Sequence, residues 1–155
     1  MEVKWAKEVF EKVLKKEQKV VARNQHKIPY TTKDGVFNDS GSENICWWTN
    51  GFWGSMMWQL YYVTQDAMYQ QAAIENEEKL DANLLSYQGL DHDNGFKWLP
   101  TAVAHYRLTK DSVAQNRALL AANHLAGRFN PVGKFIRAWN NWEGNQDASL
   151  AGRVF

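Results

Sequence analysis

Two carboxylates and an imidazole stand next to one another in the stretch GLDHDNGFKWLP, as Asp91, His92 and Asp93. Side chains of these types can exchange protons with a substrate near neutral pH, and carboxylates can also hold hydroxyl groups in place. The three residues come directly before the sequence N-G-F at 94–96, where a helix is expected to begin. An acidic residue at that position most often caps the helix. Whether the cluster does chemistry therefore depends on the elements around it.

Tryptophan is unusually common in this sequence, with eight among 155 residues. A buried indole N–H must find an acceptor, so a core seldom needs so many of these rings. Apolar rings with a polar edge suit a surface on which sugar rings stack. An aromatic-rich core is the alternative, and composition alone does not decide between the two.

An internal repeat surrounds the acidic cluster. The sequence N-G-F occurs at 50–52 and again 44 residues later, and each copy precedes an apolar helical stretch that ends in the pattern Y-x-x-T-x-D. The last residues of that pattern, Asp66 and Asp111, are placed to cap the second helix of each unit. A fixed period of this length is typical of stacked helical hairpins.

The other segments also predict an all-α fold, because strand signals are nearly absent. We expect an amphipathic helix at 2–23, a long loop at 24–46 and the start of a third hairpin near Trp139. The inner helix of each unit is apolar nearly all round and is expected to be buried on both sides, whereas the outer helices keep a polar face. This pattern predicts a closed (α/α)6 toroid, with an open solenoid as the alternative.

The length of the chain limits how much of a toroid it can form. Six hairpins of this period need roughly 270 residues, and the chain holds about three hairpins. We therefore predict that residues 1–155 are a single domain, the N-terminal portion and about the first half of a toroid in a longer protein. The open edge would expose apolar helix flanks, so self-association through that edge is expected.

Equivalent positions in successive repeats face the central cavity of a toroid, which brings candidate site residues together. Five side chains are expected to converge there: Trp48, Phe52, His92, Asp93 and Trp139. Aromatic rings around a carboxylate and an imidazole are what a saccharide subsite requires. The ordinary alternatives are core packing for the aromatic residues, a loop histidine and a helix cap. Asp91 is interpreted as a solvated loop acid.

Charge and cysteine content argue against several other functions. The net charge is +1 with both signs interspersed, so neither nucleic acid nor a membrane surface is an expected partner. The single cysteine, Cys46, suits a reducing compartment. The N-terminus has no signal sequence, and the longest apolar run is shorter than the roughly 20 residues of a membrane span. We expect a soluble, cytoplasmic protein without a metal or other cofactor.

At WWTNGFWGSMMWQLYYVT, DHDNGF and RFNPVGKFIRAWN the chain resembles the unsaturated glucuronyl hydrolases, glycoside hydrolase family 88. The three motifs together are specific, and the resemblance runs from about residue 1 to 142. It implies an (α/α)6 toroid and a protein more than twice as long as this chain. It also implies a substrate class: oligosaccharides released by lyases from glycosaminoglycans such as chondroitin or hyaluronan, with a 4,5-unsaturated uronic acid at the non-reducing end.

The implied reaction differs from ordinary glycoside hydrolysis, so the usual rule about carboxylate spacing does not apply. A carboxylic acid protonates C4 of the vinyl ether, water adds at C5, and the hemiketal collapses and expels the aglycone. The resemblance makes Asp93 one of two essential aspartates. It also implies substrate contacts for four residues: Trp48, Phe52, His92 and Trp139.

The sequence departs from the family pattern in two places. The second aspartate is expected in a motif like I-D-C-x-x-N directly after Phe155, and the surroundings of Asp147 do not match that motif. Gly54-Ser55 stands where Pro-Gly is expected, which should alter the helix entry rather than the chemistry. Arg137 and Lys97 are weak candidates for binding the uronate carboxylate, and a surface charge is the commoner role for both.

Helix electrostatics suggest how the two aspartates divide the work. Amide groups at a helix N-terminus favour an ionised carboxylate, and a protonated His92 would do the same. We therefore predict that Asp93 is ionised, orients hydroxyl groups and stabilises positive charge, while the second aspartate is the acid and base. Desolvation of Asp93 by aromatic walls would favour the opposite assignment.

Two other functions stay open at this level. The chain could be a non-catalytic saccharide-binding helical module, or a toroid enzyme with different chemistry, such as a sugar epimerase or a uronate lyase. An unsaturated chondroitin disaccharide separates these hypotheses, because the hydrolase alone would remove the absorbance of the C4=C5 bond.

Overall fold

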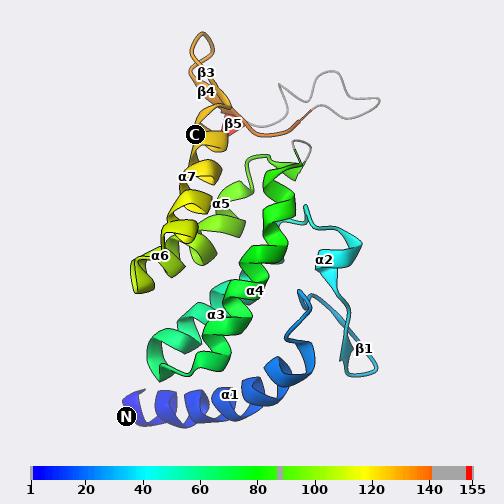
Figure 1. Ribbon diagram of the computed structural model, residues 1–155, viewed down its shortest axis with the longest axis vertical. Helices are drawn as coiled ribbons and strands as arrows, with labels where there is room; N and C mark the ends of the chain where they lie inside the picture. The colour runs from blue at the N-terminus through cyan, green and yellow to red at the C-terminus, as the bar shows by residue number, and fades with distance from the viewer. Residues whose placement is uncertain (1, 87–88, 141–152, 155) are drawn as a thin grey trace.

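The computed structural model describes residues 2–86, 89–140 and 153–154, and this part of the chain is mostly helical (Figure 1). Its long helices are α1 (Glu2–Asn24), α3 (Asn50–Thr64), α4 (Ala67–Leu84) and α7 (Ser112–Ala126). Between α4 and α7 lie α5 (Asn94–Trp98), a π-helical segment (Leu99–Val103) and α6 (Ala104–Thr109). Among the described residues, no helix is long and apolar enough to cross a membrane.

The two repeat units form two helical hairpins with the same corner, as predicted. The first hairpin joins α3 to α4, and the second joins α5–α6 to α7. At each corner a threonine hydroxyl, of Thr64 or Thr109, accepts a hydrogen bond from the amide of the following aspartate at 3.2 Å. The carboxylates of Asp66 and Asp111 accept from amides of the next helix at 2.9 and 2.8 Å, which confirms both predicted caps.

The N-G-F sequence has a structural reason at the first hairpin. Gly51 packs so closely on the second hairpin that a Cβ there would lie 2.5 Å from the carbonyl oxygen of Lys97. The asparagines before both glycines are buried and donate to backbone carbonyl groups. Asn50 donates to the loop before α3 at 2.9 Å, and Asn94 donates to a carbonyl group of α7 at 3.1 Å. The motif therefore lets two hairpins approach each other.

The inner helix of the second hairpin is interrupted, which the sequence analysis did not anticipate. Pro100 lies at the start of the π-helical segment and has no N–H to donate, so the regular bonding pattern cannot continue through it. The expected burial of the inner helices on both sides is also wrong. Tyr62 and Val63 of α3 are 67% and 59% exposed, because the described residues supply neighbours on one side only.

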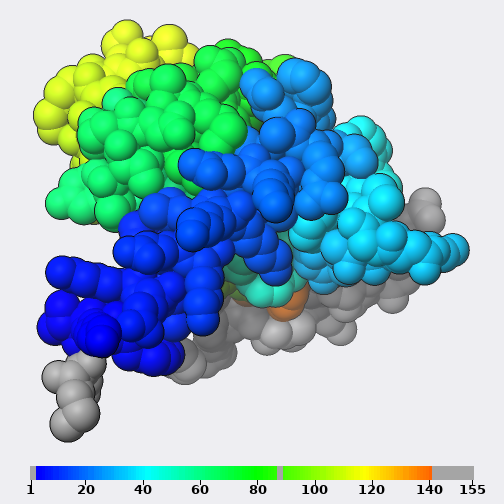
Figure 2. All heavy atoms as spheres, turned by 90° about the horizontal axis from the view of Figure 1, so that it is seen from below, coloured from blue at the N-terminus to red at the C-terminus, as the bar shows by residue number. Residues whose placement is uncertain are grey.

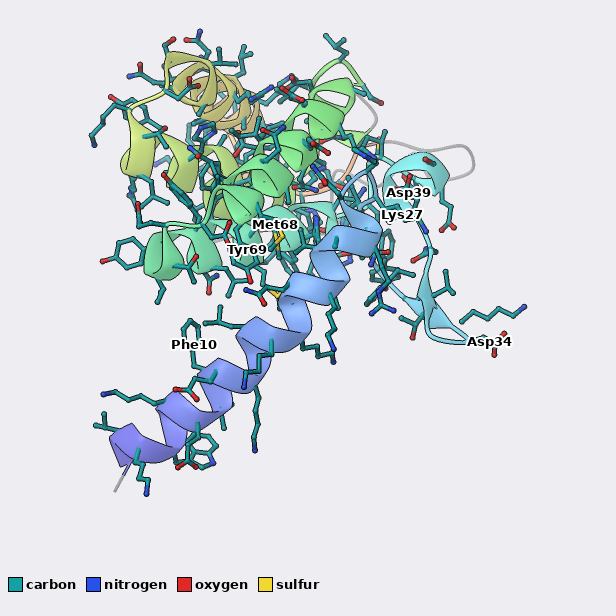
Figure 3. All side chains as sticks on the ribbon, turned by 60° about the horizontal axis from the view of Figure 1, so that its bottom comes forward. Phe10, Lys27, Asp34, Asp39, Met68 and Tyr69 are labelled. Carbon is teal, nitrogen blue, oxygen red and sulfur yellow. The ribbon has the colours of Figure 1, made fainter. Side chains whose placement is uncertain are left out.

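The helix α1 packs its C-terminal half against the first hairpin. Val20 and Val21 are buried beside α3, and Phe10 is turned toward Met68 on α4 (Figure 3). The N-terminal half projects beyond the other helices (Figure 2). Trp5 there is 68% exposed, so the predicted amphipathic helix is covered along only part of its length.

The segment predicted as a long loop contains regular structure. It holds a hairpin of β1 (Thr32–Lys33) and β2 (Val36–Phe37), followed by the short helix α2 (Ser40–Glu43). Asp34 and Gly35 at the hairpin tip have φ angles of 52° and 77°, as a tight β-turn requires. Asp39 caps α2 and also accepts a hydrogen bond from the amide of Ile28 at 2.9 Å.

After α7 the described chain forms a small sheet that the sequence analysis did not predict, and the third hairpin expected from near Trp139 falls mostly outside the described residues. The strands β3 (Phe129–Asn130), β4 (Phe135–Arg137) and β5 (Arg153–Val154) form an antiparallel sheet in that order. Up to Asn140 no helix begins near Trp139. Residues 141–152, with Asp147, lie outside the described residues.

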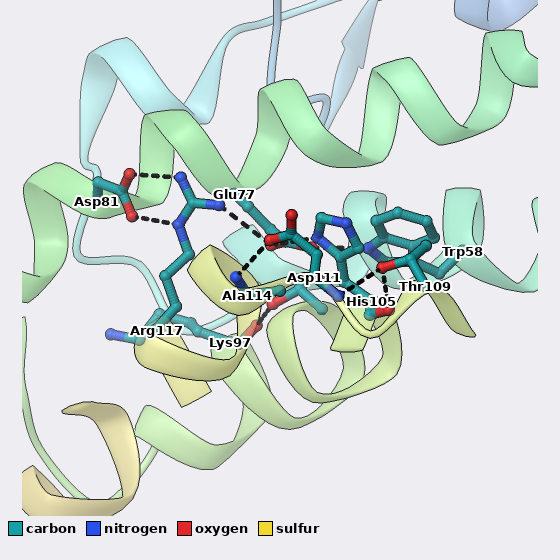
Figure 4. Close-up of polar contacts among 10 residues, drawn as sticks. Trp58, Glu77, Asp81, Lys97, His105, Thr109, Asp111, Ala114 and Arg117 are labelled. Carbon is teal, nitrogen blue, oxygen red and sulfur yellow. Dashed lines mark hydrogen bonds and ion pairs between the residues drawn. The ribbon is translucent and has the colours of Figure 1, made fainter. Parts of the chain in front are cut away.

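A buried polar network joins the two hairpins between two apolar clusters (Figure 4). Glu77 on α4 is fully buried and accepts hydrogen bonds from Trp58 Nε1 at 2.8 Å and from His105 Nδ1 at 3.1 Å. Arg117 on α7 approaches the same carboxylate at 3.5 Å and donates two hydrogen bonds to Asp81. The network ties α3, α4, α6 and α7 together and fixes the angle between the hairpins.

Candidate functional site

The turn before α5 is held by Asp91 rather than by Asp93. The carboxylate of Asp91 accepts a hydrogen bond from the amide of Asp93 at 2.9 Å, which stabilises the turn. Asp93 occupies the N-cap position, yet its side chain makes no capping hydrogen bond. Asp91 is a partly exposed loop acid, as interpreted, with a role in the turn that was not predicted, and the ordinary alternative for Asp93 loses its main support.

His92 has both ring nitrogens in contact with partners. Its backbone amide and its Nδ1 both lie 3.0 Å from the carbonyl oxygen of Ala138, and its Nε2 lies 3.3 Å from a carboxylate oxygen of Asp93. Trp139 meets the imidazole edge-on, with ring centroids 4.2 Å apart. The side chains of His92 and Asp93 are about one-fifth exposed, at 21% and 20%. Three predicted site residues therefore converge at the edge of the α4–α5 loop.

The other two predicted residues belong to an aromatic cluster between the start of α3 and α5. Trp48 and Phe52 lie 5.5 Å apart, and Phe96 contacts them at 5.6 and 6.3 Å. All three rings are partly exposed, and their pairs are edge-to-face. Phe96 was not among the predicted site residues, although it is the repeat equivalent of Phe52. The helix α5 links this cluster to Asp93, which lies three residues earlier.

Lys97 lies below the site and holds the two loops that lead into the inner helices. Its side chain is fully buried, and Nζ donates to the carbonyl oxygen of Gly89 at 2.8 Å and approaches that of Cys46 at 3.5 Å. Burial lowers the pKa of the amine, and the negative charges of Asp91 and Asp93 oppose this effect. Lys97 is thus neither a surface charge nor able to reach a ligand carboxylate.

Arg128, which the sequence analysis did not single out, fixes the segment that carries Trp139. Its guanidinium donates to the carbonyl oxygens of Leu90, Arg137 and Ala138 at 2.9, 2.6 and 2.8 Å. These acceptors are backbone groups of distant loops, so no sequence pattern marks them. Arg137 lies half-buried in β4, and its suggested contact with a ligand carboxylate stays a prediction.

The acidic cluster has ligand atoms close enough for a metal ion, but its geometry is already explained without one. One ligand atom each from Asp91, His92 and Asp93 lies within 4.8 Å of the others. Asp91 Oδ1 accepts from an amide, and both imidazole nitrogens of His92 have protein partners. The site is therefore better described as an imidazole and a carboxylate at ion-pair distance beside aromatic rings.

Comparison with known proteins gives this arrangement a context, although no family model matches the chain. The chain is 34% identical to an unsaturated chondroitin disaccharide hydrolase of Streptococcus pneumoniae over 95 residues, 61% of this chain and 24% of that protein. It is also 34% identical to the unsaturated glucuronyl hydrolase of Bacillus sp. strain GL1 over 93 residues, 59% of this chain and 25% of that protein. The chain is partially homologous to the unsaturated glucuronyl hydrolases.

The fold agrees with this homology. The crystal structure of the Bacillus glucuronyl hydrolase, whose description assigns it to the degradation of glycosaminoglycan, superimposes with a TM-score of 0.64 and 29% identity. The superposition covers 85% of this chain and 33% of that structure. The mostly helical part described here therefore matches a part of such an enzyme, and this chain spans about a quarter of the curated relatives.

Proposed function

We propose that this chain is the N-terminal portion of an enzyme that removes a 4,5-unsaturated uronic acid from lyase-generated glycosaminoglycan oligosaccharides. The observation that carries the proposal is the carboxylate of Asp93. It makes no capping bond, it faces Nε2 of His92 at 3.3 Å, and the ring of His92 in turn contacts Trp139. The partial homology to unsaturated glucuronyl hydrolases supports the same substrate class.

In the proposed reaction the C4=C5 double bond is hydrated. A carboxylic acid gives a proton to C4, water attacks C5 and loses a proton to the resulting carboxylate, and the hemiketal opens with release of the aglycone. Asp93, ionised, orients the uronate hydroxyls and stabilises the positive charge that develops at C5. The aromatic rings of Trp48, Phe52 and Trp139 pack against the sugar, and His92 binds a hydroxyl. The proton donor is a second aspartate, which we place outside these five residues.

The fold proposed for the whole enzyme is the (α/α)6 toroid. Two features support this extension of the two hairpins: they share one corner geometry, and N-G-F stands at the start of each inner helix. An inner helix of such a ring would present its exposed aromatic residues to the central cavity. Phe52 and Phe96, 44% and 50% exposed at equivalent positions, are the residues expected there.

The test is incubation with an unsaturated chondroitin disaccharide while the absorbance of the conjugated double bond is followed. Wild type should remove the absorbance, and Asp93→Asn should lower the rate on the order of 1000-fold. Asp34→Asn at the tip of the β1–β2 hairpin (Figure 3) is the matched control and should leave the rate unchanged. An Asp93→Asn enzyme that stays active but loses only the alkaline limb of its pH–rate profile would make Asp93 the proton donor instead.

A saccharide-binding module without chemistry is the second candidate, favoured by the exposed aromatic cluster. The exposed rings of Trp48, Phe52 and Phe96 would then be the binding surface. Quenching of tryptophan fluorescence by the disaccharide, with the absorbance of the double bond unchanged, would support this candidate. If the disaccharide causes neither quenching nor loss of absorbance, the remaining candidate is a sugar enzyme of another class, such as an epimerase or a uronate lyase.

A further inference from the structure

We propose that Arg128 is a positioning residue of the candidate site, because it holds the peptide that orients His92 and carries Trp139. Its effect on saccharide binding rests on the proposed function, whereas its effect on His92 does not. Arg128 follows α7 directly, and its hydrogen bonds to the carbonyl oxygens of Leu90, Arg137 and Ala138 hold the backbone around the site.

The guanidinium of Arg128 connects the segment at Leu90 with the segment at 137–140. Nη1 donates to the carbonyl oxygen of Leu90 at 2.9 Å and to the side-chain oxygen of Asn140 at 2.7 Å. Nε and Nη2 donate to the carbonyl oxygens of Arg137 and Ala138 at 2.6 and 2.8 Å. A planar fork of five donors can satisfy such a set, and a lysine ammonium cannot reproduce it.

The carbonyl oxygen of Ala138 is the point where this clamp meets the site. It accepts from Arg128 Nη2 at 2.8 Å, and from the amide and the Nδ1 of His92, both at 3.0 Å. A carbonyl group has no proton to give, so Nδ1 must be the donor. Arg128 thereby helps to hold the acceptor that keeps a proton on Nδ1 and turns Nε2 toward Asp93.

The same contact places the indole of Trp139. Its peptide follows Ala138 directly, and its ring meets His92 at an interplanar angle of 75°. The ring is still 37% exposed, so apolar burial restrains it less than it restrains a core tryptophan. Hydrogen bonds from Arg128 to the carbonyl oxygen of Ala138 and to the side chain of Asn140 restrain the residues on both sides of Trp139.

The test measures the imidazole directly, in the full chain and without substrate. Long-range 15N–1H NMR correlations of the ring report the tautomer, and an NOE reports the contact between His92 and Trp139. Wild type should show a proton on Nδ1, and Arg128→Gln should show a mixture of ring states and lose the NOE. Arg107→Gln, an exposed arginine on α6, is the matched control and should resemble wild type. Affinity of Arg128→Gln for the unsaturated disaccharide should fall about tenfold.

Two results would overturn the proposal: a wild-type ring without a proton on Nδ1, or an Arg128→Gln chain that keeps both the proton on Nδ1 and the NOE. If Arg128→Gln fails to fold, Arg128→Lys decides, because it retains the charge and loses the fork. The wild-type tautomer stands as a readout in every case. A wild-type chain that binds no saccharide would contradict the proposed function while the NMR result still decides the role of Arg128.

Discussion

Asp91 holds the turn before α5, and Asp93 keeps its carboxylate available for a ligand. Asp91→Ala should therefore lower the free energy of unfolding by about 1 kcal/mol, because the amide of Asp93 loses its acceptor. Asp93→Ala should change stability by less than about 0.5 kcal/mol, since its side chain makes no capping bond. Urea denaturation of both variants measures the difference. Equal losses would mean that Asp93 supports the helix after all.

Lys97 is a buried charge whose protonation links stability to pH. Burial lowers its pKa below the ordinary value of 10.5, so the unfolded chain binds this proton more tightly than the folded chain. Stability from this group must then rise with pH between the lowered pKa and 10.5. Lys97→Met should remove that rise, and at neutral pH it should cost about 1 kcal/mol because the carbonyl group of Gly89 keeps only its donor from Asn83.

Denaturant unfolding of the Lys97→Met chain at neutral and alkaline pH checks both effects. Lys12→Met, on the exposed face of α1, is the control and should follow wild type at every pH. A parallel pH dependence in wild type and Lys97→Met would show that the buried amine does not contribute to the alkaline behaviour.

Among the elements, the segment between α1 and α3 depends on one carboxylate. Burial alone would raise the pKa of Asp39, but hydrogen bonds from the Ile28 amide and the Ser42 hydroxyl and the charge of Lys79 outweigh it and lower the pKa. A lowered pKa gives stability that is present above the ordinary value of 3.8 and is lost as pH falls below it. Asp39→Asn should cost about 1 kcal/mol at pH 7 and little near pH 2.

Unfolding curves of Asp39→Asn and wild type at several acidic pH values test this. The two free energies should converge as the pH falls. Curves that stay separated by the same amount at every pH would mean that the charge of Asp39 has no part in anchoring the segment, and that only its hydrogen-bond geometry matters.

Elements with local signals were predictable from the sequence, and elements with distant partners were not. The caps at Asp66 and Asp111 were found because a cap binds the next turn of its own helix. The pair Asp34-Gly35 is an equally local hairpin signal and was overlooked. Pro100 indicates a break in the helix, but the length of the π-helical segment depends on packing between the hairpins.

The candidate site shows the same division. The repeat led to Trp48, Phe52 and His92, and it would have led to Phe96 if it had been applied to the last residue of N-G-F. Lys97 and Arg128 had no such signal, because their acceptors are carbonyl groups that every residue has. Only the packed chain shows which carbonyl groups lack a partner.

For the whole molecule, Glu77 determines whether the two hairpins pack. Its carboxylate accepts from Trp58, His105 and Arg117, and no water reaches it. In Glu77→Gln an amide N–H₂ must face at least one donor, so the variant should lose about 3 kcal/mol or more. Asp81→Asn, whose side chain is 45% exposed, should lose at most about 1 kcal/mol. Equal losses in thermal or urea unfolding would contradict a network centred on Glu77.

The outer side of the second hairpin is where we expect the molecule to meet another chain. Gly51 of the first hairpin packs on Lys97, but nothing among the described residues lies within 4 Å of a Cβ built on the equivalent Gly95. On the same hairpin, Leu119 and Leu120 of α7 are 54% and 53% exposed, and Leu120 lines a hollow of about 860 Å³. An exposed apolar face of this kind favours association.

Sedimentation velocity should therefore show a mass that increases with concentration, and the double variant Leu119→Lys/Leu120→Lys should stay monomeric. The exposed residues Val3 and Trp5 on α1 form the opposite apolar edge of the described chain, and Val3→Lys/Trp5→Lys tests it separately. If the α1 variant still associates, two copies of the α7 face meet and a closed dimer results. If both variants are monomeric, the two edges meet head to tail, as successive hairpins would in a ring. A wild-type chain that is monomeric at all concentrations would show that neither edge mediates self-association.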